Sequence, residues 1–383
     1  MVADNNRIFY ACQAVAISPC PDNNTFVEAH GVQSVGVNTS FNLEQAFELG
    51  QISIYENIEG LPEVEVTLEK VLDGYPLLYR LATMPRVDPN PREDDLVGRT
   101  KNRCCVALAI YPDSLGAVSG APQTQVYMSG MYLNAVNYTF PTEGNCTESV
   151  TLVGNHKEWK VGNPTADRFG STQAAFYEFG NDKPLNGQLA FFKGGIQRRE
   201  NVIMMSSILP SSIYGMGRGT GSAATSLILG TGNNWRASLK APIVHIQNIT
   251  IGADMGRDDI LELGQKFPYY RAAKFPVEVT SEFEVISLSG DFINALEAGD
   301  PVFIGKENEG NNTGEETISI ILQDGTKFDL GKKNRLSAVT YGGGDAGGGN
   351  STMKYSYSTF NDLTITPPHA TGTMIGQGER GTV

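Results

Sequence analysis

Hydrophobic and polar residues alternate with a period of two along most of the chain, which is the pattern of half-buried β-strands. The stretch V-E-V-T-L-E at 64–69 places its apolar side chains on one face and its polar side chains on the other. Further strands are predicted at 150–153, 277–280, 318–321, 336–341 and 354–358. The pattern therefore predicts an all-β protein.

Short helices are predicted at two places, 72–82 and 289–298, where apolar residues recur at helical spacing. Asp73 is the expected N-cap of the first helix, and Ser289 or Asp291 is the expected N-cap of the second. The predicted fold class is thus all-β with short helices.

The same pattern occurs twice in the chain. Residues 32–69 align with 246–282 at a constant offset of 214, which slips by one residue near the end. A weaker correspondence links L-N-A-V-N-Y at 133–138 with L-S-A-V-T-Y at 336–341. Solenoid repeats run to about 20–50 residues, so a period this long indicates a whole domain that is present twice. The positions that match in type are Glu48, Leu49, Gly50, Gln51, Tyr55 and Pro62, which meet Glu262, Leu263, Gly264, Gln265, Tyr269 and Pro276.

The repeat defines the expected domain organisation. Each copy is predicted to be a β-sandwich or small barrel built from strand, strand, short helix and further strands. Gly-rich sequence at 215–221 and 230–232 marks the segment between the copies as rich in loops. The expected segments are an N-terminal arm (1–27), a first module (28–164), a bridge (165–242), a second, homologous module (243–365) and a C-terminal tail (366–383).

The motif E-L-G-Q occupies the same place in both copies. It is open to a functional interpretation, or it forms a tight turn in which the glycine adopts positive φ and the glutamate caps neighbouring amides. We prefer the structural interpretation, in which the motif forms a turn.

Composition supports a folded protein of about two domains. The 383 residues include 43 glycines, 40% hydrophobic and 19% charged residues, which suits a β-protein with many turns. The net charge of −13 argues against a basic surface for nucleic acid. No apolar run approaches the roughly 18 residues that span a bilayer, and no secretory signal is visible, so synthesis in a cytosol is expected.

No catalytic, cofactor or metal site is expected. The glycine-rich stretches at 299–307 and 342–347 resemble nucleotide-binding motifs, but the first has the wrong spacing and the second lies between two predicted strands. The four histidines are scattered, without paired ligand spacing. The five cysteines are odd in number and lack C-x-x-C pairs, so we expect thiols and neither a disulfide framework nor a zinc site: Cys12, Cys20, Cys104, Cys105 and Cys146.

The run G-V-Q-S-V-G-V-N-T-S-F-N-L-E-Q-A-F-E-L-G-Q, followed by Y-E-N-I-E-G-L-P-E-V-E-V-T-L-E-K, resembles the tail tube proteins of tailed bacteriophages. In the second copy, F-P-V-E-V-T-S-E-F-E-V and N-R-L-S-A-V-T-Y-G-G-G-D are similar to the same family. The resemblance covers both modules, and its motifs are structural, without catalytic residues.

This resemblance implies a structural virion protein. Tube proteins with one module form rings of six subunits, so a chain with two modules is expected to form trimeric, pseudo-hexameric rings. The rings would stack into a tube whose acidic lumen conducts DNA without binding it, with 113–122, 342–349 and the termini as stacking contacts. Expected partners are other copies of the chain, the tail sheath, the tape-measure protein and baseplate or terminator proteins. The expected location is the virion tail, after synthesis in the bacterial cytoplasm.

Two other functions stay open at this point. One is a different ring protein of a phage tail, neck or baseplate. The other is an extracellular β-sandwich that binds or adheres, which would gather exposed aromatic residues in one groove; the tyrosines are instead spread along the predicted strands.

Overall fold

Strands dominate the part of the chain that a computed structural model describes, which confirms the all-β prediction. The described residues are 8–20, 26–50, 52–84, 96–111, 122–161, 176–177, 179–180, 195–203, 210, 213, 244–287, 293–294, 302–303, 316–344 and 349–366. The helical elements are η1 (Tyr10–Cys12), α1 (Leu78–Ala82), α2 (Leu96–Arg99) and η3 (Arg199–Asn201). The strands are β1 (Gln13–Pro19), β2 (Phe26–Glu28), β3 (Val32–Phe47), β4 (Ile54–Val71), β5 (Arg103–Ile110), β6 (Thr124–Pro141), β7 (Thr147–Gly154), β8 (Glu158–Val161), β9 (Phe179–Gly180), β10 (Val202–Ile203), β11 (Val244–Asp254), β12 (Asp258–Ile260), β13 (Tyr270–Ala272), β14 (Glu278–Ser287), β15 (Ile293–Asn294), β16 (Val302–Phe303), β17 (Ser319–Leu322), β18 (Lys327–Asp329), β19 (Arg335–Gly342), β20 (Thr352–Phe360) and β21 (Thr364–Thr366).

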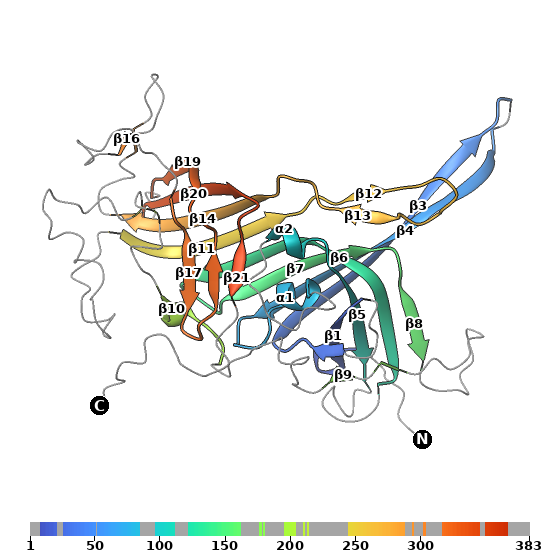
Figure 1. Ribbon diagram of the computed structural model, residues 1–383, viewed down its shortest axis with the longest axis horizontal. Helices are drawn as coiled ribbons and strands as arrows, with labels where there is room; N and C mark the ends of the chain where they lie inside the picture. The colour runs from blue at the N-terminus through green and yellow to red at the C-terminus, as the bar shows by residue number, and fades with distance from the viewer. Residues whose placement is uncertain are drawn as a thin grey trace, which may run out of the picture.

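Eight strands of a 13-stranded sheet form an antiparallel run through both halves of the chain, and we call this run the main sheet (Figure 1). Its strand order is β3–β4–β7–β6–β11–β14–β20–β19. The two halves are joined where β6 pairs with β11, from Ala135 opposite Asp254 to Pro141 opposite Asn248. Within the described residues the main sheet is open, so neither half closes into a barrel.

A second layer covers one face of the main sheet. In the first half, β6 extends beyond β7 and pairs with β5 and β8, and β5 continues through β1 and β2 to β9. In the second half, a separate sheet of β10, β17, β18 and β21 crosses the main sheet (Figure 1). Each half is therefore layered like a sandwich.

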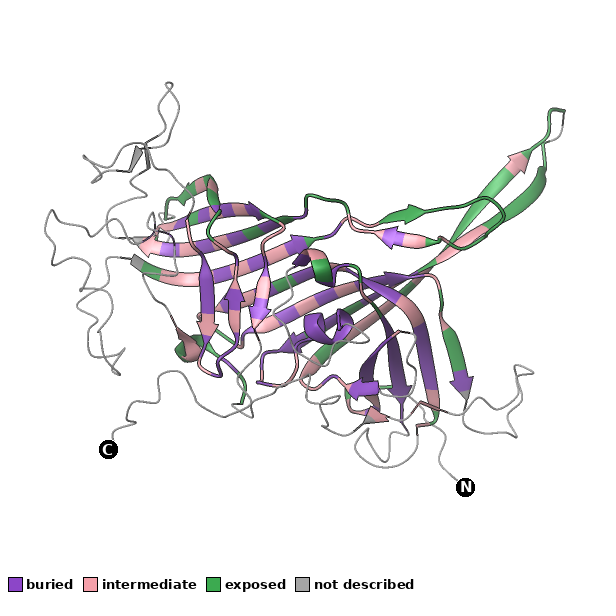
Figure 2. Cartoon of the chain, in the orientation of Figure 1, coloured by how far each residue is buried: buried purple, intermediate pink, exposed green. Residues whose placement is uncertain are grey.

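One hydrophobic core extends through both halves. Alternate residues of the main-sheet strands are buried, as the colour bands along the strands in Figure 2 show. The buried cluster contains Leu68 from the first half and Phe283 from the second. Phe328 of β18 bridges the halves, because its ring centroid lies 4.6 Å from that of Tyr138 and 5.4 Å from that of Phe140.

The first predicted helix is present but shorter than expected. Helix α1 begins at Leu78, and Asp73 is not its N-cap. Asp73 instead accepts a hydrogen bond from the amide of Tyr75 and forms a 2.8 Å ion pair with the buried Lys70. The helix is capped from outside by Glu148 of β7, whose carboxylate accepts hydrogen bonds from the amides of Leu78 and Tyr79. A distant residue thus satisfies the first amides, which local sequence could not reveal.

The second predicted helix, at 289–298, is wrong where the structure describes it. Residues 293–294 form β15 and pair with β16, with Ile293 opposite Phe303. A segment of ten residues is too short for apolar spacing to separate a helix from a strand, and the cross-strand pairing decides the outcome.

The cysteine prediction also needs correction. Cys20 and Cys105 form a disulfide that ties the end of β1 to β5, whereas Cys12, Cys104 and Cys146 are buried thiols. The pairing of β1 with β5 places Ser18 opposite Cys105. Cys20 follows directly after β1, so this pairing brings it close to Cys105, although the two cysteines are 85 positions apart. Sequence spacing carries no signal of that proximity. Burial raises the pKa of both the Cys104 and Cys146 thiols to about 12, so they are unreactive at neutral pH.

Parts of the predicted arm and bridge belong to these sheets. Strand β1 lies within the expected arm and pairs along its whole length with β5. Within the expected bridge, β9 pairs with β2, and β10 pairs with β17. Most of the bridge and residues 367–383 of the expected tail lie outside the described residues. None of the described helices has the length and apolar character required to span a membrane.

Candidate assembly surfaces

The two halves of the main sheet share one strand order. Across the sheet, the order is β3–β4–β7–β6 in the first half and β11–β14–β20–β19 in the second. In both halves the fourth of these strands along the chain lies between the second and the third. The ladder of β3 with β4 is interrupted by a bulge at Gln33, and that of β11 with β14 at Gln247, 214 residues later. Both glutamines donate a 3.3 Å hydrogen bond to the carbonyl oxygen two residues earlier.

A second pair of bulges also corresponds. The ladder of β6 with β7 shifts between Leu133 and Ala135, and that of β19 with β20 shifts between Leu336 and Ala338. Both shifts fall inside the related motifs L-N-A-V-N-Y and L-S-A-V-T-Y. Because a bulge bends a strand at one defined place, the two halves share local geometry as well as strand order.

The ladders differ from the sequence alignment in the second strand of each half. The alignment places Val64 with Val277, whereas the strand pairings place Val64 in the position of Val279. Val64 lies opposite Gly154, and Val279 lies opposite Thr359. Gly154 and Thr359 correspond to each other when the related stretches that begin at Asn145 and Asn350 are aligned, so Val64 and Val279 are equivalent in the two halves. A slip of two residues keeps every side chain on its own face, so an alternating sequence does not reveal it.

Both E-L-G-Q motifs lie at the tips of long hairpins. Gly50 at the β3–β4 tip has φ of +94°, and Gly264 at the β12–β13 tip has φ of +88°. The amide of Gln265 donates to the carbonyl of Glu262 at 3.4 Å, which closes a tight turn. These are the turn conformations that the structural interpretation of the motif predicts; Gln51 lies outside the described residues.

The other repeated positions do not all occupy equivalent places in the two halves. Tyr55 and Tyr269 are both exposed. Pro62 lies within β4, opposite Phe41, whereas Pro276 precedes β14 and follows a cis peptide bond. The two tyrosines are therefore alike in exposure, whereas the two prolines occupy different places in the fold.

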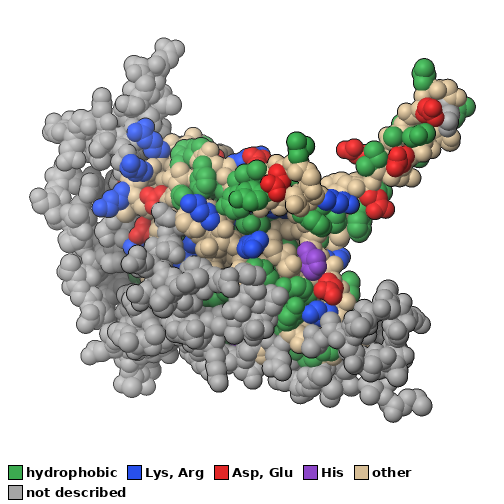
Figure 3. All heavy atoms as spheres, turned by 45° about the vertical axis from the view of Figure 1, so that its right-hand side comes forward, with side chains coloured by type: hydrophobic (Ala, Val, Ile, Leu, Met, Phe, Trp, Pro, Cys, Tyr) green, Lys and Arg blue, Asp and Glu red, His purple; other side chains and the backbone are tan. Residues whose placement is uncertain are grey.

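The hairpin of β3 and β4 projects well beyond the rest of the main sheet (Figure 1). Its outer part exposes large apolar side chains, and Figure 3 shows them beside acidic ones on the projecting arm. These side chains are Phe41, Leu43, Phe47, Leu49, Ile52, Ile54, Tyr55 and Ile58. An apolar surface of this extent on a thin projection is typical of a contact with another molecule.

Both outer edges of the main sheet lack a strand partner within the described residues. β3 pairs only with β4, and β19 pairs only with β20. Unpaired edge strands expose backbone donors and acceptors that can pair with another chain. The sequence motifs did not identify these edges, because edge position follows from strand order alone.

The face of the main sheet opposite the core is polar and acidic. In the second half it carries a shallow groove of about 270 Å³, lined by Asn248, Thr250, Glu282, Glu284, Thr340, Gly342, Thr352 and Lys354. At its centre, Glu282 forms a 2.6 Å ion pair with Lys354 and accepts hydrogen bonds from Thr250 and Ser356. Glu65, Glu69 and Glu278 lie on the same face by strand alternation. We call this surface the polar face.

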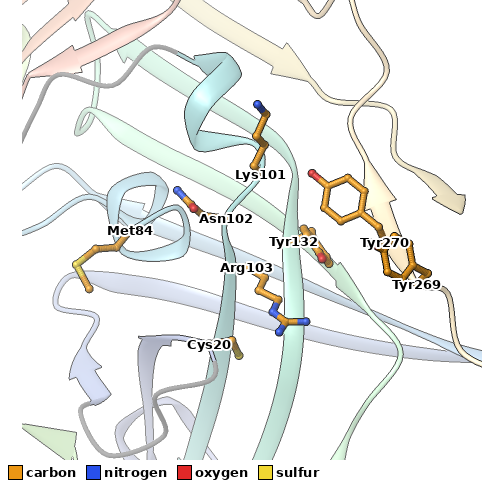
Figure 4. A pocket seen from close by; sticks show the side chains of 8 residues that line it. All are labelled: Cys20, Met84, Lys101, Asn102, Arg103, Tyr132, Tyr269 and Tyr270. Atoms are coloured by element: carbon orange, nitrogen blue, oxygen red, sulfur yellow. The ribbon is translucent and has the colours of Figure 1, made fainter. Parts of the chain in front are cut away.

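A second depression, of about 580 Å³, lies where the β12–β13 hairpin meets the first half (Figure 4). Lys101, Arg103 and three tyrosines, Tyr132, Tyr269 and Tyr270, are among its lining residues. The rings of Tyr132 and Tyr270 meet edge to face, with centroids 6.1 Å apart. Beside them, Arg257 stacks 5.2 Å from the Tyr132 ring centroid and donates to the Leu133 carbonyl. Burial lowers the pKa of Arg257 to about 10. The contacts of Arg257 with Tyr132 and Leu133 attach the base of the β12–β13 hairpin to the first half.

The described residues provide no metal-binding cluster of three or more His, Cys, Asp or Glu side chains. The glycine-rich stretch at 342–347 follows β19 and leads toward β20, although 345–348 are outside the described residues. Of the stretch at 299–307, only β16 is described, and 113–121 of the expected stacking loop is likewise outside.

No protein-family model matches the chain, and no curated protein matches its sequence. Among solved structures, the sheath–tube complex of an extracellular contractile injection system in the extended state is 12% identical, with a TM-score of 0.29, and covers 42% of this chain and 95% of that chain. The tube-terminating cap of the anti-feeding prophage is 11% identical, with a TM-score of 0.29, covering 42% and 96%. A chain of the anti-feeding prophage baseplate is 13% identical, with a TM-score of 0.29, and the match covers 40% of this chain and 96% of that one. The likeness is loose and concerns part of the fold.

Proposed function

We propose that this chain is a structural, non-enzymatic protein that assembles with copies of itself into rings, and that the rings stack into the inner tube of a particle of the bacteriophage-tail type. The observation that carries the proposal is the open main sheet, which among the described residues has an unpaired strand edge at each end, and whose polar face is acidic. The sequence motifs that resemble tail tube proteins are those that form this sheet.

The two halves are proposed to be copies of one module. Their common strand order, their two corresponding bulges and their glycine-tipped hairpins support this. When two modules are joined in one chain, every second contact between modules in a ring is intramolecular. That contact then avoids the entropic cost of bringing two separate molecules together. A ring of three chains would then have six modules.

Ring size follows from strand geometry. Three main sheets contribute about 24 strands, and with about 4.8 Å between strands and a tilt of about 40° the barrel would be about 50 Å across between backbones. The core and second layer would lie outside, and the polar face would line the lumen. An acidic wall repels phosphate, so DNA would pass without adhering.

Negative-stain electron microscopy of the purified full chain tests the proposal. We expect hollow rings on the order of 10 nm across, given the barrel and its outer layers, with short tubes at higher concentration. Mass measurement should give three chains per ring. Isolated globules at every concentration would contradict the assembly role.

The depression in Figure 4 favours one alternative, a binding module, because three tyrosines and two cationic side chains are among the residues that line it. Assembly of the wild-type chain and of Tyr269→Ala, which removes the most exposed of the three rings, distinguishes the two functions. A ring protein would form rings in both cases, whereas a binding module would form rings in neither.

A further inference from the structure

We infer that β19 of one chain pairs with β3 of the next chain in the register that β6 and β11 adopt within the chain. This inference rests on the proposed ring and names its contact residue by residue. The partner is a second copy of the chain, and the contact runs head to tail, so it closes only in a ring.

The internal junction supplies the template. β6 is the last strand of the first half and β11 is the first strand of the second, and they pair over seven residues. β19 holds the place of β6 in the second half, and β3 holds the place of β11 in the first. Each chain therefore contains one completed junction and the two separated sides of another.

The bulges fix the register of the missing junction. The first bulge relates β3 to β11 by 214 positions, through Gln33 and Gln247. The second relates β6 to β19 by 203 positions, through the shifts after Leu133 and Leu336. At the internal junction, Ile251 lies opposite Tyr138. The residue 214 positions before Ile251 is Val37, and the residue 203 positions after Tyr138 is Tyr341. The template therefore places Val37 of one chain opposite Tyr341 of the next. The neighbouring pairs are Asn38 with Thr340 and Thr39 with Val339.

The exposure of two tyrosines agrees with this assignment. At the internal junction, Tyr138 is 0% exposed and Ile251 is 1% exposed. Tyr341 is the counterpart of Tyr138, lies on the same core-facing side, and is 57% exposed. In both junctions a β-branched residue faces a tyrosine, which is a favourable cross-strand pair. Val37 of a second chain would cover the ring that Tyr341 exposes.

Cysteine cross-linking measures the register directly. In an antiparallel ladder, neighbouring residue pairs alternate between wider and closer spacing, and one of two adjacent pairs is therefore the closer one. We choose two double variants of the full chain for this reason: Asn38→Cys with Thr340→Cys, and Thr39→Cys with Val339→Cys. β3 and β19 lie at opposite ends of the main sheet, so a bond between them joins different chains. Asn38→Cys with Ala338→Cys, two residues out of register, is the control.

Under mild oxidation we expect at least one in-register variant to give a ladder of covalent species that ends at three chains on a non-reducing gel. The control should give less than a tenth of that yield. Stronger cross-linking in the control would overturn the register while leaving the ring intact. Rings by microscopy without any cross-link would overturn the edge contact and leave the proposed function standing. Absence of both rings and cross-links would overturn both.

A second variant tests the contribution of the tyrosine. Tyr341→Ala should raise the concentration needed for ring assembly at least tenfold, with unchanged circular dichroism of the unassembled chain. Phe360→Ala is the matched control, because Phe360 lies in the adjacent strand β20 and is 55% exposed. Equal assembly of the two variants would contradict the assigned place of Tyr341.

Discussion

At the residue scale, a buried carboxylate holds helix α1 against the main sheet. Glu148 is fully buried in β7, and besides capping α1 it accepts a 2.8 Å hydrogen bond from the Tyr138 hydroxyl. A carboxylate that satisfies three donors costs less to bury than an isolated one, but its desolvation is incompletely offset. Burial accordingly raises the pKa of Glu148 above its ordinary value of 4.5.

This raised pKa predicts a pH dependence of stability. The folded protein binds a proton at Glu148 more tightly than the unfolded chain, so the contribution of this group to the free energy of unfolding is greatest below pH 4.5. It then declines by at most about 1.4 kcal/mol per pH unit as the pH rises through the folded-state pKa. Glu148→Gln should remove this decline, measured by urea unfolding across pH. Glu143→Gln, at an exposed turn residue, should keep the wild-type profile.

The tip glycines make a second prediction. Gly50 and Gly264 have positive φ, and a Cβ at either would meet nothing within 4 Å, so only backbone strain opposes substitution. Gly264→Ala should destabilise its turn locally by about 1 kcal/mol. Hydrogen exchange of hairpin amides should become about fivefold faster, with the global unfolding midpoint unchanged. Gly264→Asn, which tolerates left-handed φ, should show a smaller effect; equal effects would exclude φ as the cause.

At the element scale, the strands could be predicted from sequence because their signal is local. Alternation at 64–69 and 354–358 reflects one buried and one solvated face, and both stretches lie in strands of the main sheet. The start of α1 could not be predicted, because its cap comes from Glu148, 70 residues away. The disulfide, the free edges and the polar-face groove likewise depend on which strands are neighbours, which a local pattern does not contain.

The projecting hairpin is the element whose length exceeds the needs of the fold. Beyond the pair of Ser40 with Glu63, its two strands pair only with each other among the described residues, yet they expose a row of large apolar side chains. In the proposed tube, a neighbouring ring is the surface that would cover them. This assigns stacking to the hairpins in addition to the loops expected from sequence.

Truncation tests that role. Replacing 41–62 with Asn-Gly joins Ser40 to Glu63 through a turn that suits a two-residue hairpin. We expect the variant to form single rings but no tubes in electron microscopy, because the edge contact is intact and the stacking surface is lost. The matched variant Leu49→Ser with Ile52→Ser should shorten tubes without abolishing rings. Full-length tubes from the truncated chain would contradict the role.

At the scale of the whole molecule, the two halves behave as one folded unit. The β6–β11 junction and the ring contacts of Phe328 with Tyr138 and Phe140 place core side chains of both halves in contact. Separating the halves would expose this apolar surface to water, at a cost that scales with its area. The junction inside the chain is therefore stabilised by core packing, and the proposed junctions between chains are the places where a ring would form and break.

The polar face makes the last prediction, which concerns DNA. Wild-type tubes should not retain duplex DNA at low salt, since the face carries more carboxylates than cations. Reversing Glu65, Glu69, Glu278 and Glu284 to lysine leaves the Glu282–Lys354 ion pair in place and should create binding that weakens steeply with salt. The control reverses Glu28, Glu143, Glu158 and Glu200, which lie outside the main-sheet strands and the hairpins, and it has the same net charge as the first variant. Gel retardation across salt concentrations compares them. Equal binding by both variants would show that net charge, and not a lumen lined by the polar face, governs contact with DNA.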